Sequence, residues 1–303
     1  MKPIKKRFVP LVLCLPVAAA LLSAPAAHAA HGAVVRVTLT SVWATPSPDP
    51  MGITYDPRTK RLLISDSEVD EMPGLWKGRN LFVVRRKGNL ASSRTLKKFT
   101  VEPEDLAMDN RHRSLYVTDD DLDRVFKDKA GKDGLFGTRD DVAVTVLHTR
   151  RFGSLDPEGL AWRGGRKPML ILTDSGDTGP TSLPRVYRIH RGMDKKFGTR
   201  DDVIKSFGVH KYGFTNAEDV AIKGKRLFIV SSRQHFILET TMKGALVRKI
   251  DLTSVGVKAA SGITFAPGTD GGKGRIYITD SGVDNNVNPG ENDGRLFELK
   301  IVP

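Results

Sequence analysis

The chain repeats one arrangement of strand-forming segments five times, and this repeat constrains the fold more than any other feature. Each unit opens with a short apolar segment that follows a Gly or an Asp. Counted from Gly52 through Asp105, Gly159 and Asp219 to Gly262, the intervals are 53, 54, 60 and 43 residues. Repeats of about 40 to 60 residues with several strand signals per unit indicate propeller blades.

Within each unit, further segments alternate β-branched or aromatic residues with polar ones, which indicates strands. The second unit shows the order well, with Glu104 to Asp109 followed by Leu115 to Asp119 and then by Arg124 to Phe126. No stretch has an amphipathic helical period of useful length, so we predict an all-β chain. The fourth strands of the first four units are expected at 96–101, 142–147, 203–207 and 246–252.

The fifth unit ends without a fourth strand, because the chain stops at Pro303 soon after the third. A suitable strand is available at the other end of the chain, from Val34 to Trp43. Pairing of this segment beside Arg295 to Leu299 would close the ring and remove its open edges. We therefore predict a β-propeller of five four-stranded blades, with six blades as the alternative.

The first 29 residues have the pattern of a signal peptide. Four basic residues precede an apolar run of 15 residues, Phe8 to Leu22, and Ala27 and Ala29 are the small residues that a signal peptidase requires. The run is too short for a stable membrane span. We expect residues 1–29 to be removed, residues 30–303 to form one propeller domain, and the product to be secreted without a transmembrane segment.

The expected mature chain is basic and contains no cysteine, because the single Cys14 lies in the leader. Residues 30–303 hold 44 Lys and Arg against 35 Asp and Glu, a net charge of +9. A basic surface attracts anionic partners. For a secreted monomer these would be an anionic small molecule, a polysaccharide or an envelope protein rather than nucleic acid, while dispersed charge that merely maintains solubility is the plainer explanation.

The second unit, Pro103 to Phe126, resembles an NHL repeat, which has a Pro-containing start, a strand ending in Asp and an Arg-containing third strand. The start Asp156-Pro157-Glu158-Gly159-Leu160 resembles those of bacterial SdiA-regulated and phytase-like esterase propellers, and more distantly those of the gluconolactonase-like, senescence-marker family. The resemblance implies a propeller fold over the whole mature chain. Those relatives commonly have six blades, whereas five units are found here.

Acidic residues stand where the first strands of three units begin. Glu104, Glu158 and Glu218 occupy equivalent positions, and Met51 and Ser261 replace them in the other two units. First strands line the channel of a propeller, so the three carboxylates would converge and suit Ca²⁺. The gluconolactonase-like resemblance likewise implies a channel metal at these residues. The alternative is a repeated structural role in which each Glu accepts backbone N–H groups.

A second set of acids follows the second strands, which should end on the same face of the ring. Alternate carboxylates resemble the start of a calcium loop, although no EF-hand pattern is completed. An Asp that bonds its own turn is the structural alternative. The candidate metal ligands of this set are Asp66, Asp119, Asp121, Asp174, Asp280 and Asp284.

A third repeat joins the third and fourth strands of units two and three, at Asp133 to Val142 and Asp194 to Val203. Both copies contain Phe-Gly-Thr-Arg-Asp-Asp. They should lie at the periphery, on the face opposite the channel mouth. We interpret them as turns whose Phe covers the blade edge, with a peripheral cation site as the alternative.

Two function classes fit these patterns. The first is a calcium-binding scaffold or binding protein of the cell envelope, which holds an anionic partner. The second is a metal-dependent hydrolase of phosphoester, ester or lactone bonds, in which the metal lowers the pKa of a bound water. Asp105 or Asp219 would then take the proton, Arg233 would hold the anion, and His235 is a further candidate base.

Overall fold

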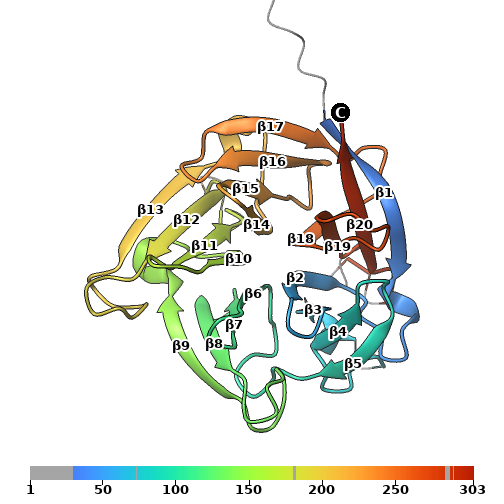
Figure 1. Ribbon diagram of the computed structural model, residues 1–303, viewed down its shortest axis with the longest axis horizontal. Coiled ribbons are helices and arrows are strands. Elements are labelled where there is room, and N and C mark those ends of the chain that lie inside the picture. The colour runs from blue at the N-terminus through green and yellow to red at the C-terminus, as the bar shows by residue number, and fades with distance from the viewer. Residues whose placement is uncertain (1–29, 73, 180–181, 284–286, 289) are drawn as a thin grey trace, which may run out of the picture.

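Figure 1 shows a computed structural model in which blades of β-strands stand around a central axis as in a propeller, built from one eight-stranded and three four-stranded sheets. The structure describes residues 30–72, 74–179, 182–283, 287–288 and 290–303. Residues 1–29, which hold the predicted signal peptide, lie outside this range. Neighbouring strands within each blade are antiparallel, and the innermost strand of every blade faces the axis.

The blades follow one another along the chain. Blade 1 contains β2 (Pro50–Asp56), β3 (Arg61–Asp66), β4 (Leu81–Arg85) and β5 (Leu90–Arg94). Blade 2 contains β6 (Leu106–Asp109), β7 (Ser114–Asp119), β8 (Arg124–Lys129) and β9 (Val142–His148). Blade 3 contains β10 (Pro157–Arg163), β11 (Met169–Asp174), β12 (Arg185–His190) and β13 (Val203–Gly208). Blade 4 contains β14 (Val220–Lys223), β15 (Arg226–Ile229), β16 (Phe236–Thr241) and β17 (Leu246–Asp251).

Blade 5 is built from both ends of the described chain. It contains β18 (Ala260–Ala266), β19 (Arg275–Asp280) and β20 (Arg295–Val302), and its outer strand is β1 (Ala30–Leu39), which pairs antiparallel with β20. The first residues of β1 also pair with β17, so blades 4 and 5 form one continuous sheet. The predicted closure by the N-terminal segment and the count of five blades are therefore confirmed.

Two predicted strand boundaries are wrong. The closing strand was expected at 34–43, but β1 ends at Leu39 and Thr40–Val42 forms a 3-10 turn. Trp43 leaves the strand because its ring packs 5.9 Å from that of Phe82 and its Nε1 donates to the carbonyl of Gly88 at 3.0 Å. An apolar residue next to a strand can thus cover the core from a turn.

The fourth strand of blade 1 was expected at 96–101, whereas β5 covers Leu90–Arg94. Leu96 is fully buried, which explains its apolar character, but its N–H bonds the side chain of Asn80 at 2.7 Å instead of a neighbouring strand. The true outer strand is polar and partly exposed, so its sequence gives little strand signal.

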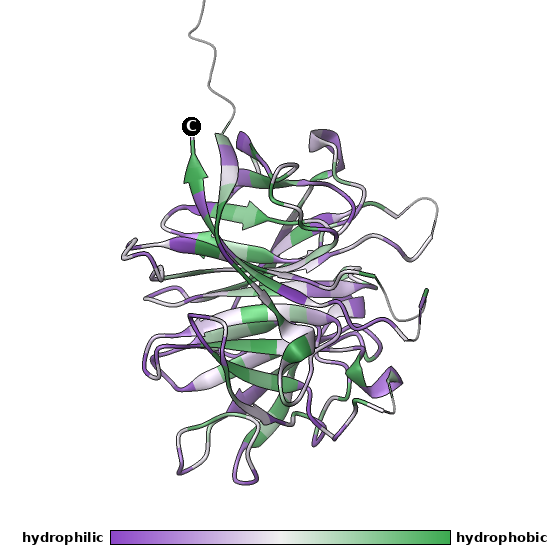
Figure 2. Ribbon diagram, turned by 90° about the vertical axis from the view of Figure 1, so that its right-hand side faces the viewer, coloured by the Kyte–Doolittle hydropathy of each residue, from purple (hydrophilic) through white to green (hydrophobic). Residues whose placement is uncertain are grey.

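Apolar side chains of the middle strands fill the space between blades. The cluster between blades 5 and 1 contains Leu62, Phe82, Tyr277 and Leu296, all almost completely buried. Figure 2 shows this hydrophobic colouring along the strands, with more hydrophilic loops projecting on both sides of the disc. In the described residues, the helical elements are 3-10 turns of three or four residues, and none is a candidate membrane span.

Candidate functional site

The loops that lead into the first strands and those that leave the second strands meet on one face of the ring, as expected from the alternating chain direction. Glu104 N–H donates to the carbonyl of Thr118, and Glu218 N–H to that of Val230, which binds each of these loops to its second strand. We call this face the acidic mouth. A cavity of about 260 Å³ opens there, lined by residues that include Glu68, Asp177, Asn216, Glu218, Arg233 and Ser281.

The axis below the mouth is closed by Asp105 and Asp219, whose side chains are almost completely buried. Asp105 accepts the N–H of Ile53 at 3.1 Å and that of Leu160 at 2.6 Å, and Asp219 accepts the N–H of Ile263 at 2.6 Å. Burial raises the pKa of both carboxyls, that of Asp219 to about 6, and the adjacent Asp219 raises the pKa of Asp105 further.

Glycines fill the equivalent positions in the other three blades. A Cβ on Gly52 would lie 2.3 Å from Cα of Asp105, and one on Gly159 would lie 2.3 Å from Cα of Asp219. The backbones of neighbouring first strands therefore pack directly against one another where Asp105 and Asp219 lie. Asp105 and Asp219 were predicted as general bases. Both oxygens of Asp105 accept N–H groups of neighbouring blades, and those of Asp219 accept the N–H of Val220 in its own blade and that of Ile263 in blade 5.

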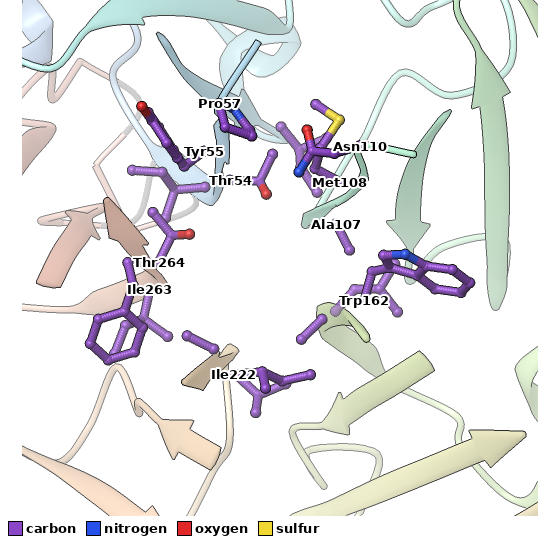
Figure 3. A pocket seen from close by; sticks show the side chains of 17 residues that line it. Thr54, Tyr55, Pro57, Ala107, Met108, Asn110, Trp162, Ile222, Ile263 and Thr264 are labelled. Atoms are coloured by element: carbon purple, nitrogen blue, oxygen red, sulfur yellow. The ribbon is translucent and has the colours of Figure 1, made fainter. Parts of the chain in front are cut away.

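Beyond Asp105 and Asp219, the first strands surround a second cavity, whose lining residues are mainly apolar although most of its exposed surface is polar. This cavity of about 240 Å³ is lined by the first strands of all five blades, with Ala107, Ile222 and Ile263 among its residues (Figure 3). Thr54 and Thr264 contribute hydroxyl groups, and Trp162 flanks the opening. Asp105 and Asp219 therefore lie between this cavity and the cavity of the acidic mouth.

The three glutamates predicted as metal ligands do converge on the mouth. Glu104 and Glu218 are almost completely buried, and Glu158 is half-buried. Burial, followed by repulsion from Glu218 and Glu104, raises the pKa of Glu158. Glu218 accepts hydrogen bonds from Asn216 Nδ2 and from Ser232 Oγ, the latter at 2.7 Å, and burial raises its pKa to about 7.

The carboxylates of the mouth that lie closest together are not the three predicted glutamates. Oxygens of Asp120, Asp156 and Glu158 all lie within 4.8 Å of one another, as do those of Glu102, Asp120 and Asp121. Across the described ranges, Glu104 and Glu218 belong to no such group. Burial raises the pKa of Asp120 to about 6, and burial together with the adjacent Asp121 raises that of Glu102 to about 8. We call these five residues the carboxylate cluster.

Sequence reasoning missed Glu102, Asp120 and Asp156 as members of this cluster. A signal was present, because a polar residue stands two positions before the glutamate in three blades, namely Glu102, Asp156 and Asn216. Asp120 lay within a quoted acidic loop. Asp119 and Asp121 were predicted as ligands instead, because they stand at alternate positions of that loop. In the structure the loop is a turn in which alternate positions do not share one side.

The acids that end the second strands hold the loops of the mouth together. Asp66 accepts Ser47 Oγ at 2.6 Å and Asp49 N–H at 3.3 Å, and Asp174 accepts the N–H groups of Leu155 and Asp156. In the same way, Asp119 accepts Leu122 N–H and Thr100 Oγ1, and Asp280 accepts the N–H groups of Lys258 and Ala259. Only Asp121 of this predicted set joins the carboxylate cluster, and Asp284 lies outside the described residues.

The remaining predicted catalytic residues lie apart from one another. Arg233 lines the mouth cavity and makes two hydrogen bonds to the carboxylate of Asp177, at 3.0 and 2.8 Å. His235 is exposed and does not line that cavity. Its carbonyl accepts the N–H of Leu252, just beyond the outer strand β17, which places His235 toward the edge of blade 4.

A basic cleft lies on the face opposite the mouth. This cavity, of about 490 Å³, is lined by Arg166 and Lys167 from the β10–β11 turn and by His190, Arg191 and Lys195 from the end of β12 and the loop that follows. Burial and the nearby Arg188 lower the pKa of His190, because the charged form is disfavoured there. Basic side chains thus surround a cavity on one side of blade 3.

No protein-family model matches the chain, and no curated protein matches its sequence. The structure is similar to Myxococcus xanthus glutaminyl cyclase, with a TM-score of 0.55 and 14% identity over 90% of this chain and 97% of that one. It is also similar to the PQQ-bound aldose sugar dehydrogenase of Streptomyces coelicolor, with a TM-score of 0.52 and 13% identity over 90% and 98% of the two chains. A luciferin-regenerating enzyme gives a TM-score of 0.51 and 13% identity over 88% and 95%.

This protein is a β-propeller. Identities this low establish the fold and nothing finer, so the chemistry has to be argued from the residues of this chain. The resemblance to NHL, phytase-like esterase and gluconolactonase-like propellers accordingly remains a prediction beyond the shared architecture.

Proposed function

We propose that this propeller is an exported binding protein of the cell envelope that takes up a calcium ion at its acidic mouth. The carboxylate cluster carries the proposal, because Asp120, Asp156 and Glu158 bring three carboxylates within 4.8 Å of one another. Calcium prefers such oxygen ligands and accepts carbonyl and water oxygens beside them. Export follows from the predicted signal peptide.

The charge distribution supports a cation rather than a set of neutral acids. In the described part of the chain, the groups that raise the pKa of Glu158 are burial and four other acids, Glu218, Glu104, Asp156 and Asp120. A divalent ion bound among Asp120, Asp156 and Glu158 would offset these repulsions with its own charge. The donor set therefore fits a hard cation.

Calcium titration calorimetry tests this proposal. The wild type should bind calcium, and Glu158→Gln should abolish one binding event, whereas Asp251→Asn, which changes an exposed acid on β17, should bind as the wild type does. Full calcium binding by a natively folded Glu158→Gln variant would overturn the mouth assignment.

The partner we propose is an anionic polymer, held in the basic cleft. Arg166, Lys167 and Lys195 present charges of one sign around a cavity, and such clusters attract polyanions over several ångströms. Binding to an immobilised anionic polysaccharide should weaken on Lys167→Glu but not on Lys243→Glu, a charge change in the exposed β16–β17 turn. Equal binding by both variants would reject the cleft.

A second candidate function is a calcium-dependent hydrolase, which the position of Glu218 favours. This residue lines the mouth cavity with Arg233, and a carboxyl with a pKa of about 7 suits a general base near neutral pH. A bound cation would supply a water of lowered pKa. Glu218 would accept its proton, and Arg233 would hold an anionic substrate.

Assays with generic phosphoester, aryl ester and lactone substrates separate the two functions. The hydrolase predicts calcium-dependent turnover that Glu218→Gln abolishes while calcium binding persists. The binding protein predicts no turnover in any of these assays, together with calcium and polymer binding.

A further inference from the structure

Two hairpins of nearly identical sequence allow an internal comparison. Asp133 to Val142 joins β8 to β9, Asp194 to Val203 joins β12 to β13, and both connections project at the rim of the ring (Figure 1). Their shared acids do the same structural work. Asp140 accepts the N–H of Lys132 at 2.6 Å, and its equivalent Asp201 accepts that of Asp194 at 3.1 Å.

The last acid of each hairpin also has a common role. Asp141 accepts the N–H of Thr138 at 2.8 Å, and its equivalent Asp202 accepts the N–H of Thr199 at 3.3 Å. Turn formation therefore explains the acids that both hairpins possess. It does not explain an acid that only one of them has.

That extra acid is Asp128 on β8, which stands where blade 3 has Ile189 on β12. Both side chains are fully buried, with 0% exposure. Ile189 packs in an apolar cluster, whereas neither carboxylate oxygen of Asp128 has a hydrogen-bond partner in the described residues. A buried carboxylate without a partner is costly.

Asp128 lies beside a compact group of acids. Oxygens of Asp133, Asp140 and Asp141 are all within 4.8 Å of one another, and Asp141 is the acid that acts most strongly on Asp128. The equivalent acids of blade 3 form no such group in the described chain. The hairpin that has the extra buried acid is thus also the hairpin in which three acids, exposed Asp133 and Asp140 and buried Asp141, come close together.

We propose that Asp128, Asp133, Asp140 and Asp141 form a peripheral calcium site, separate from the acidic mouth. All the available ligands are oxygens, which suits Ca²⁺ rather than a transition metal. The ion would add a second counter-charge for Asp128, beside the charge of Lys98 that already acts on it. Blade 3, which has Ile189 in its place, would hold no ion.

Three basic side chains border this site, and their positions sharpen the proposal. Arg94 donates to the carbonyl of Phe136 and Arg113 to that of Gly134, so both guanidinium groups serve the hairpin backbone. Lys98 Nζ donates to the carbonyl of Asp141 at 2.8 Å. Its ammonium group competes with an incoming cation, and Lys98→Met should therefore tighten calcium binding severalfold.

Calorimetry on the full mature chain tests the site with calcium itself. Asp128→Asn and Asp133→Asn should each lose one calcium equivalent that the wild type binds, while the matched change in blade 3, Asp194→Asn, should lose none. Asp133 is exposed, so its variant keeps the test decisive even where Asp128→Asn fails to fold. Glu158→Gln reports the mouth separately, so failure at one site is distinguishable from failure at the other.

Unchanged calcium stoichiometry in natively folded Asp133→Asn and Asp128→Asn would overturn the proposal and assign the Asp128–Asp141 contact to a shared proton. Loss of calcium from Asp194→Asn to the same extent as from Asp133→Asn would also overturn it, because the two hairpins would then not differ. Anomalous scattering from calcium-soaked crystals should place the ion at the β8–β9 hairpin.

Discussion

The carboxyl groups of Asp105 and Asp219 lie against each other on the ring axis and together accept backbone N–H groups from the three other blades. Asp105 receives Ile53 of blade 1 and Leu160 of blade 3, and Asp219 receives Ile263 of blade 5. Two acids thus connect the innermost strands of the whole ring. These hydrogen bonds predict a contribution to stability, and the role of general base expected from the sequence stays a prediction.

Replacement of Asp105 by Ala should destabilise the fold strongly. It leaves two buried N–H groups without acceptors, at about 1 to 3 kcal/mol each. Asp105→Asn keeps one acceptor and should cost about half as much. Urea unfolding at constant pH measures both, and a loss below about 0.5 kcal/mol for Asp105→Ala, a size typical of surface changes, would contradict this role.

Stability should depend on pH through Asp66, whose pKa burial raises from 3.8 to about 7. Between these values the folded state holds the proton and the unfolded chain releases it, so the folded state binds more protons. The free energy of unfolding should therefore fall as the pH rises from about 4 to about 7 and lose this contribution above pH 7.

Asp66→Asn should flatten that decline, because the amide does not titrate. The comparison is made by urea unfolding across this pH range in chelator, with Asp194→Asn as the exposed control. A decline in Asp66→Asn as steep as in the wild type would show that other buried acids carry the dependence.

The seam between β1 and blade 1 should be sensitive at Gly88. Its φ of +91° is left-handed, and an added Cβ would lie 2.0 Å from Oγ1 and 2.8 Å from Cβ of Thr38 on β1. Gly153 has a similar φ of +83° with open space around it. Gly153→Ala should cost about 1 to 2 kcal/mol for the backbone alone.

Gly88→Ala should cost clearly more than Gly153→Ala in urea unfolding, because the ring closure must also shift. Thr38→Gly removes the clashing atoms and should recover part of the difference in the double variant. Equal losses at the two glycines would mean that β1 moves aside freely.

Asp120→Asn should have opposite effects with and without calcium. In chelator it removes a repelling charge from the carboxylate cluster, so the melting temperature should stay equal or rise. In calcium it removes a ligand, so the stabilisation that the wild type gains from the ion should shrink. Thermal unfolding in both conditions checks this, and a lower melting temperature in chelator would contradict the repulsion.

The sequence predicted the ring because the first and second strands of each blade are apolar and buried and recur at equivalent places. Outer strands are half exposed, so β5 is as polar as a loop, and buried Leu96 in a turn looked more like a strand. For the same reason the closing strand was placed four residues too late. Burial, rather than pairing, determines which residues are apolar.

The site was predictable only in part. The alternation of chain direction correctly places Glu104, Glu158 and Glu218 on one face. Which oxygens come within reach of a single ion depends on loop paths, and these bring Asp120 and Asp156 to Glu158 instead. The sequence also contains a sign of the Asp105–Asp219 contact, because positions 52, 105, 159, 219 and 262 alternate between Gly and Asp. This alternation can be interpreted only once the close packing of the backbones at the axis is known.

An odd ring cannot alternate two residue types without a fault, and here two glycines, Gly262 and Gly52, meet where blade 5 adjoins blade 1. Asp105 and Asp219 lie between two separate cavities, that of the acidic mouth and that lined by the first strands. An ion bound at the mouth and a polymer bound in the basic cleft would therefore not contact each other, and any coupling between the two would require a change in how the blades pack.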